Sequence, residues 1–276
     1  MTNNLKPNPL LEMQYQQLAE IAGCLWEKGW AERNAGNISL NITGLFTDES
    51  ISKPAKLQSV NLDENYSALA GMSFLVTCTG SRMRDLARLP KENSVIIRIS
   101  DNGSSYQLIP VADNKLETKP PTSELITHLG IHSLVAKRGT PEKVIIHTHA
   151  TELIALTQHP GYKSAESLNH LLWGMHPETM IFVPGGIGFV PYTLPGSEAI
   201  AKLSIQCFEQ HDIIVWEKHG VFAIGETVSD TFDKIDILCK SAKIYFMCRS
   251  AGFVPEGLSL SQLDELRTLT KKFSTQ

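Results

Sequence analysis

Two histidines stand two residues apart directly after an apolar run, in residues 144–151 (VIIHTHAT). Because strand side chains alternate between two faces, His147 and His149 should point the same way at the end of a buried strand. Neutral imidazoles placed side by side offer nitrogen ligands of the kind that zinc prefers. A catalytic zinc needs a third protein ligand, and KHG supplies His219 directly after another apolar run, IIVW. These three residues predict a site for one zinc ion per chain.

A second set of possible ligands lies on one predicted helix. Glu124, His128 and His132 are spaced i, i+4, i+8 and therefore share one face of that helix. This face is either another metal site or a polar stripe, and spacing alone leaves both interpretations open. Glu124 taken by itself is also typical of an acid in a first helical turn, where the helix dipole favours it.

Three further stretches carry groups that can hold a phosphate dianion. Asn34 and Asn37 flank Gly36, and a second turn brings Thr79 and Gly80 together. Thr122 and Ser123 precede the predicted helix, whose N-terminal backbone donors favour anions. Each stretch also has a purely structural interpretation, as a turn or as a helix cap. The segment GGIG at 185–188 lacks the spacing of a dinucleotide fingerprint and is interpreted as a turn.

Helical and strand periodicities place these residues in one α/β domain spanning residues 1–276. Helices are predicted over residues 11–28, 124–138, 150–157, 166–173, 196–211 and 227–250 and at the end of the chain. Strands are predicted after Gly36, over 74–77, 95–99, 106–109, 144–146 and 179–183, after Gly188, and over 213–216 and 221–224. Thr122 or Ser123 is the predicted cap of the second helix, and Thr227 that of the long one. Residues 43–70 are interpreted as a surface insertion.

Composition narrows the class of protein. The net charge is −4 with a pI of about 6.1, which argues against a nucleic-acid partner. The sequence has no apolar run long enough to span a membrane, and its start lacks a secretory signal. Five scattered cysteines without a CxxC pair favour reduced thiols and a cytoplasmic location.

Five motifs occur in an order that resembles the class II aldolase/adducin family. They are RNAGN (33–37), TCTGS (77–81), PPTSE (120–124), HTHATELIALT (147–157) and KHGVFAIG (218–225). The resemblance implies a mostly antiparallel sheet covered by helices on both faces. It implies zinc held by His147, His149 and His219, with Glu124 as acid/base and the three polar stretches around a phosphate. It also implies a homotetramer whose active sites lie between subunits.

The implied reaction is the cleavage of a phosphorylated ketose. The similarity favours L-rhamnulose 1-phosphate, split to glycerone phosphate and L-lactaldehyde through a metal-stabilised enediolate. A second proton-transfer residue maps onto Glu178 in HPETMIFVPGGIG, where the match is looser, and it would act on a neighbouring subunit's site. Cleavage of L-fuculose phosphate and 4-epimerisation of L-ribulose 5-phosphate are alternatives within the family. A non-catalytic, adducin-like interaction protein is a more distant one.

Overall fold

The computed structural model describes residues 9–45, 59–109 and 119–273. Its strands are β1 (Asn37–Asn41), β2 (Ser59–Asn61), β3 (Ser73–Thr77), β4 (Ser94–Ile99), β5 (Ser105–Ile109), β6 (Val144–Thr148), β7 (Gly188–Val190), β8 (Ile213–Trp216) and β9 (Gly220–Gly225). They form one nine-stranded sheet in the order β2-β5-β4-β3-β1-β6-β9-β8-β7. Within it β7 and β8 are parallel and the other pairs are antiparallel. The predicted mostly antiparallel sheet is confirmed.

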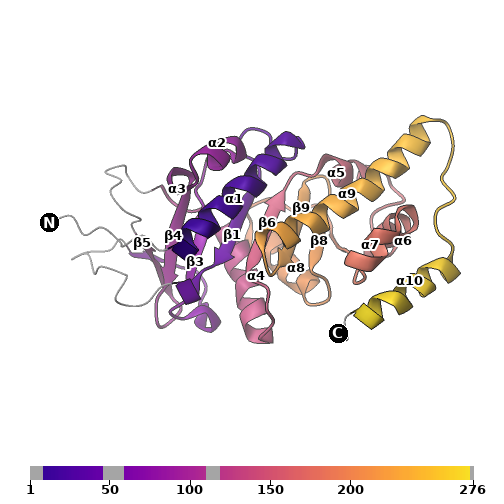
Figure 1. The fold of residues 1–276 in the computed structure, drawn as a ribbon. Helices are drawn as coiled ribbons and strands as arrows, with labels where there is room; N and C mark the ends of the chain where they lie inside the picture. Colours follow the sequence, from indigo (N-terminus) through magenta and orange to yellow (C-terminus); the bar gives the residue numbers. More distant parts are fainter. Residues whose placement is uncertain (1–8, 46–58, 110–118, 274–276) are drawn as a thin grey trace.

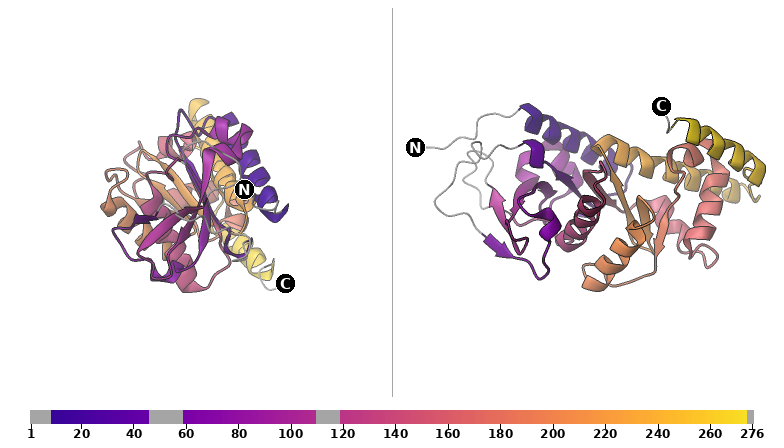
Figure 2. Two further views of the ribbon diagram at one scale, coloured as in Figure 1. Left: turned by 90° about the vertical axis from the view of Figure 1, so that its left-hand side faces the viewer. Right: turned by 90° about the horizontal axis from the view of Figure 1, so that it is seen from below.

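Helices cover both faces of the sheet, as predicted (Figures 1 and 2). The first face carries α1 (Pro9–Glu27), α2 (Met83–Arg88), α5 (Thr151–Leu156), α6 (Ala165–Met175) and α9 (Val228–Ser250). The second carries α4 (Leu125–Arg138) and α8 (Glu198–Phe208). The remaining helices are α3 (Pro90–Asn93), α7 (Pro177–Phe182), α10 (Leu260–Phe273) and the short 3-10 turns Thr43–Leu45 and Ser67–Leu69. No helix in the described ranges has the length and apolar character needed to cross a bilayer.

In the central strands, successive side chains alternate between the two faces of the sheet. Ile38 of β1 and Ile146 of β6 are buried in the cluster beneath α1 and α9, whereas Ile145 belongs to the cluster beneath α4 and α8. Burying each of these side chains stabilises the fold by about 1.5–3 kcal/mol relative to leaving it exposed. Since neighbouring strand residues point to opposite faces, Ser39 and His147 point toward α4.

The predicted strand over residues 179–183 is wrong, because Thr179 to Phe182 belong to α7. Pro177 stands at the start of this helix, where its missing N–H removes no hydrogen bond and its fixed φ suits a helix. The short apolar run TMIFV resembles a buried strand in sequence. In the fold Met180 is buried while Phe182 is exposed, which is the one-sided burial of a helix.

The start of α4 also differs from the prediction. Its N-cap is Glu124, not Thr122 or Ser123, and the Glu124 side chain makes no capping hydrogen bond. The Thr122 hydroxyl instead accepts a hydrogen bond from the Glu124 backbone N–H, with a distance of 3.3 Å. The predicted cap at Thr227 is confirmed, since its side chain accepts from the backbone N–H of Asp230.

The predicted surface insertion at 43–70 is only partly within the described chain, because residues 46–58 lie outside it. Residues 59–70 are mostly exposed, but they are not wholly irregular. Strand β2 pairs with β5 at the edge of the sheet, and Tyr66 and Leu69 are buried in the cluster beneath α4. This part of the segment therefore extends the sheet and its core.

Candidate active site

Three imidazoles meet at one end of the central strands. His147 lies near the end of β6, His149 follows it, and His219 lies in the turn between β8 and β9. Because β6 and β9 are antiparallel and pair Thr148 with Val221, the end of one adjoins the start of the other. The three histidines each present a ligand atom, and these atoms lie within 4.8 Å of one another. The structure thus brings together the residues that the sequence proposed as ligands.

Gly220 makes this convergence possible. A Cβ atom at this position would lie 2.5 Å from the backbone oxygen of Thr148 and 3.1 Å from Cε1 of His147. Any side chain would therefore push β9 away from β6. The preceding Lys218 has a φ of +62°, a left-handed conformation that is uncommon for a residue with a side chain. The KHG turn is thus held tightly against the end of β6.

Outer hydrogen bonds fix two of the rings. Nδ1 of His147 lies 3.0 Å from the backbone oxygen of Val221, and Nδ1 of His149 lies 2.7 Å from Oε1 of Glu32. Because carbonyl and carboxylate oxygens accept, both Nδ1 atoms donate and both Nε2 atoms are left for a metal. Nδ1 of His219 is buried without a hydrogen-bond partner among the described residues.

The electrostatics favour neutral rings at His147 and His219. Burial, followed by the neighbouring imidazoles of His149 and His219, lowers the pKa of His147 well below its ordinary value. Burial and then His149 also lower the pKa of His219. Neutral imidazole is the form that binds metal, so these rings suit a divalent cation such as zinc.

Glu124 lies beside the imidazoles. Its Oε2 is 3.6 Å from Nε2 of His147 and accepts a hydrogen bond of 2.7 Å from Nδ2 of Asn37. The side chain is only 11% exposed. A carboxylate in this position can take or give a proton at a group bound in front of the histidines.

The predicted phosphate residues surround the same cavity, whose volume is about 200 Å³. A backbone bridge between Cys78 and Pro121 joins two of the three stretches, and β1 lies between β3 and β6 to bring in the third. Gly36 has a φ of +79°, and a Cβ atom there would lie 2.9 Å from the backbone oxygen of His147. The predicted residues that line the cavity are Asn34, Gly36, Asn37, Thr79, Gly80, Thr122, Ser123, Glu124, His147, His149 and His219.

Glu178 is the predicted site residue that does not line this cavity in its own chain. It lies in the first turn of α7, and its Oε2 is 3.1 Å from Nε2 of His176. Helix α7 lies with α6 and α10 at the end of the molecule remote from β4 and β5 (Figure 1). Its place in a helix corrects the prediction that it precedes a strand. A role across a subunit interface stays a prediction.

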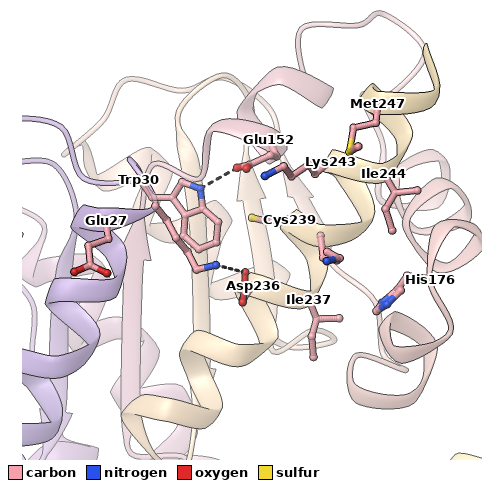
Figure 3. A pocket seen from close by; sticks show the side chains of 12 residues that line it. Glu27, Trp30, Glu152, His176, Asp236, Ile237, Cys239, Lys243, Ile244 and Met247 are labelled. Carbon is pink, nitrogen blue, oxygen red and sulfur yellow. Dashed lines mark hydrogen bonds and ion pairs between the residues drawn. The ribbon is translucent and has the colours of Figure 1, made fainter. Parts of the chain in front are cut away.

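A larger cavity, of about 690 Å³, lies beside α1 and α9 (Figure 3). Its charged and polar groups are partly paired with one another: Lys28 with Asp236 at 2.7 Å, and Nε1 of Trp30 with Oε2 of Glu152 at 2.8 Å. None of the predicted site residues lines it. Trp30 connects it to the histidine site, since its backbone oxygen accepts a hydrogen bond from the N–H of His149.

Sequence reasoning missed Glu32, which orients His149, and it missed the contacts of His128 and His132. Glu32 directly precedes the motif RNAGN, so its position near the site had a local signal. The two histidines had a signal in their helical spacing with Glu124, but nothing in the sequence indicated their partners. Both are buried and bond to Ser39 of β1.

Comparison with known proteins identifies the class to which this fold and this site belong. Residues 16–246 match the family described as "Class II Aldolase and Adducin N-terminal domain". The chain belongs to this family.

Individual proteins to which the chain is similar are aldolases that act on sugar phosphates. The chain is 42% identical, over 96% of its length and 97% of the other's, to the rhamnulose-1-phosphate aldolase of Bacteroides thetaiotaomicron. It is 34% identical to the rhamnulose-1-phosphate aldolase of Mannheimia succiniciproducens, over 90% of each chain. Among solved structures, a sugar-phosphate aldolase of Thermotoga maritima superposes with a TM-score of 0.74 and 29% identity, covering 90% of this chain and 99% of that one.

Proposed function

We propose that this chain is a zinc-dependent aldolase that splits L-rhamnulose 1-phosphate into glycerone phosphate and L-lactaldehyde. The observation that carries the proposal is the convergence of three imidazoles and Glu124 on one cavity with a polar lining. The choice of sugar follows the names of the relatives from Bacteroides thetaiotaomicron and Mannheimia succiniciproducens. Their similarity extends over nearly the whole chain, so it includes the residues around the cavity.

We infer that His147, His149 and His219 hold one zinc ion. The fit rests on neutral nitrogen donors, on two Nδ1 atoms already bonded elsewhere, and on the buried, unpartnered Nδ1 of His219. Zinc bound there would act as a Lewis acid that stabilises the negative charge left on the three-carbon fragment when the C3–C4 bond breaks.

We assign to Glu124 the proton transfer at the carbon atom that becomes negatively charged when the C3–C4 bond is cleaved. Its carboxylate lies at the edge of the imidazole cluster and is mostly enclosed by protein, so water competes little for it. In the cleavage direction the carboxyl group gives this carbon a proton, and in the condensation direction the carboxylate removes it.

We assign binding of the substrate's phosphate group to the three polar stretches. Gly36 and Gly80 both have positive φ and stand in turns that face the cavity, where backbone N–H groups can bind an anion. The side chains of Asn34, Thr79, Thr122 and Ser123 add amide and hydroxyl donors. Asn37 also lines the cavity, but its carboxamide already bonds His128 and Glu124.

The proton of the C4 hydroxyl needs a second acid/base residue, and we assign it to Glu178 of a neighbouring subunit. Its side chain is about half exposed and does not line the cavity of its own chain, which suits action in trans. This assignment requires an oligomer, for which we propose a homotetramer. We place the enzyme in the cytoplasm, in keeping with the five free thiols of its cysteines.

Replacing Glu178 with alanine should slow carbon–carbon cleavage more than it slows exchange of the glycerone phosphate proton with solvent. General acid–base residues typically contribute about 10²–10⁴-fold, and this loss should fall on the aldehyde half of the reaction alone. Cleavage rates and deuterium exchange into glycerone phosphate measure the two halves separately. Equal losses in both would remove Glu178 from the aldehyde side.

The proposed function is tested by measuring metal content and product release on the same preparation. We expect about one zinc per chain, because the described chain has one cluster with metal-ligand spacing. Glycerone phosphate should appear with L-rhamnulose 1-phosphate and stop when a chelator is added. Release from L-fuculose 1-phosphate alone would overturn the choice of sugar. Absence of both metal and release from all ketose phosphates would point to the non-catalytic branch of the family.

A further inference from the structure

A chain of buried hydrogen bonds runs from the core to the carboxylate of Glu124. Nε2 of His132 lies 2.8 Å from the hydroxyl of Ser39, and that hydroxyl lies 2.7 Å from Nδ1 of His128. Nε2 of His128 bonds Oδ1 of Asn37, whose Nδ2 donates to Oε2 of Glu124 at 2.7 Å. The four residues behind the glutamate are at most 6% exposed. The chain therefore starts deep in the core and ends at the cavity.

This series of hydrogen bonds follows from the spacing of its residues in a strand and in a helix. Asn37 and Ser39 are two apart on β1 and so point to the same face of the sheet. Glu124, His128 and His132 are four apart and follow one face of α4, which lies on that side. When α4 packs on β1, the side chains of the strand row and of the helix row alternate. Each hydrogen bond therefore joins a residue of the helix row to a residue of the strand row.

The chemistry of the end groups fixes the direction of every bond. The Glu124 carboxylate can only accept, so the Asn37 amide donates to it and turns its oxygen toward His128. His128 must then carry its proton on Nε2, because an unprotonated Nε2 would face an oxygen with two lone pairs. In a neutral ring Nδ1 is left as an acceptor, and the Ser39 hydroxyl donates a hydrogen bond to it.

The ring of His132 completes the series. Because the Ser39 hydroxyl donates its hydrogen bond to His128, its oxygen accepts a hydrogen bond from the Nε2–H of His132. Burial is the main cause that lowers the pKa of His128 to about 3 and that of His132 well below its ordinary value, so both rings are neutral. Every donor in the series therefore points toward the carboxylate.

Two other interpretations of His128 and His132 fit the structure less well. A metal site is disfavoured because both nitrogens of His128 are occupied, and the described chain has its metal-ligand spacing at the other three histidines. A solvated polar stripe is excluded, since both rings are buried against Phe222 and Phe74. Four polar residues taken into the core carry a desolvation cost that only well-satisfied hydrogen bonds offset.

We propose that Asn37 and His128, supported by Ser39 and His132, are positioning residues that hold the Glu124 carboxylate in front of the histidine cluster. The proposal rests on the proposed function, in which Glu124 transfers a proton. Glu124 makes no capping bond, and its 3.6 Å separation from His147 is too long for a hydrogen bond. In the described part of the chain, the Asn37 amide is the donor that fixes this carboxylate.

The first test measures the donor-to-acceptor direction of these hydrogen bonds without any assay of activity. Nitrogen-15 NMR of the zinc-loaded, histidine-labelled protein should show both rings neutral with the proton on Nε2, with signals assigned by loss in His128→Gln and His132→Gln. A proton on Nδ1 of His128 would overturn the proposal whatever the enzyme cleaves. This result is independent of whether L-rhamnulose 1-phosphate is the substrate.

The second test compares two substitutions of His128. Glutamine keeps an N–H donor near the position of Nε2 and should retain much of the turnover, whereas phenylalanine keeps the ring volume and loses both bonds. We expect His128→Phe to lower kcat by about tenfold to hundredfold, as for other outer residues that orient a catalytic group, with KM and zinc content unchanged. Equal kcat values for the two variants, or for His128→Phe and wild type, would contradict the positioning role.

A matched pair separates positioning from stability. Ser39→Ala removes a buried hydroxyl from the chain, and Thr231→Val removes a buried hydroxyl from α9, away from the cavity. Both should lower the melting temperature, but only Ser39→Ala should lower kcat. A wild-type kcat in Ser39→Ala, or an equal fall in Thr231→Val, would overturn the proposal. Absence of turnover in the wild-type enzyme would instead fault the proposed function, with the NMR result left standing.

Discussion

His147→Ala is expected to lose zinc and aldol cleavage together. A catalytic zinc is held by three protein ligands and keeps one position open, so two imidazoles cannot retain it at ordinary free zinc concentrations. The loss of turnover should exceed the about tenfold to hundredfold typical of residues that only orient a ligand. Elemental analysis and glycerone phosphate release, measured on the same preparation, check the result.

This substitution also disturbs packing, because the ring of His147 is buried and stacks on Phe222 with 4.1 Å between centroids. His149→Ala provides the cleaner variant, since its side chain is 20% exposed and removing it opens less of the core. It should lose metal and turnover, with a melting temperature close to that of the metal-free wild-type protein. His170→Ala, on the exposed side of α6, is the matched control and should keep both. A variant lacking His147 or His149 that retains stoichiometric zinc would exclude the removed histidine as a ligand.

The convergence of the three histidines was predictable because much of it depends on geometry within short segments. The alternation of a strand places His147 and His149 together, and a tight turn between two apolar strands places His219 beside a backbone. What could not be predicted is the pairing of β6 with β9, which brings His147 and His219 together although they are 72 positions apart in the sequence. The order of the family motifs supplied that step.

The errors arose where distant contacts decide the outcome. Residues 179–182 form part of a helix since α7 buries one side against α6, α9 and α10, and a five-residue run carries no period long enough to show this. The hydrogen-bond partners of His128 could not be predicted from the sequence for the same reason. Ser39 precedes it by 89 residues, and only the packing of α4 on β1 joins them.

Glu124→Gln is expected to keep zinc and lose most of the turnover. Glutamine has the volume of glutamate, and its carbonyl oxygen can still accept the hydrogen bond from Asn37. It cannot exchange a proton with the substrate carbon, so the contribution of a general acid–base group, about 10²–10⁴-fold, should be lost. Exchange of the glycerone phosphate proton with solvent should fall by the same factor as cleavage, because both pass through this one proton transfer.

Glu32→Gln is the matched control for this substitution, because it too replaces a carboxylate next to the histidine cluster. Its amide oxygen can still accept from Nδ1 of His149, so the ring keeps its orientation and turnover should change far less. The contrast assigns the loss in Glu124→Gln to proton transfer and not to the removal of negative charge near the cation. Near-normal exchange in Glu124→Gln would exclude it as the base, and the proton would then have to be moved by another group at the cavity.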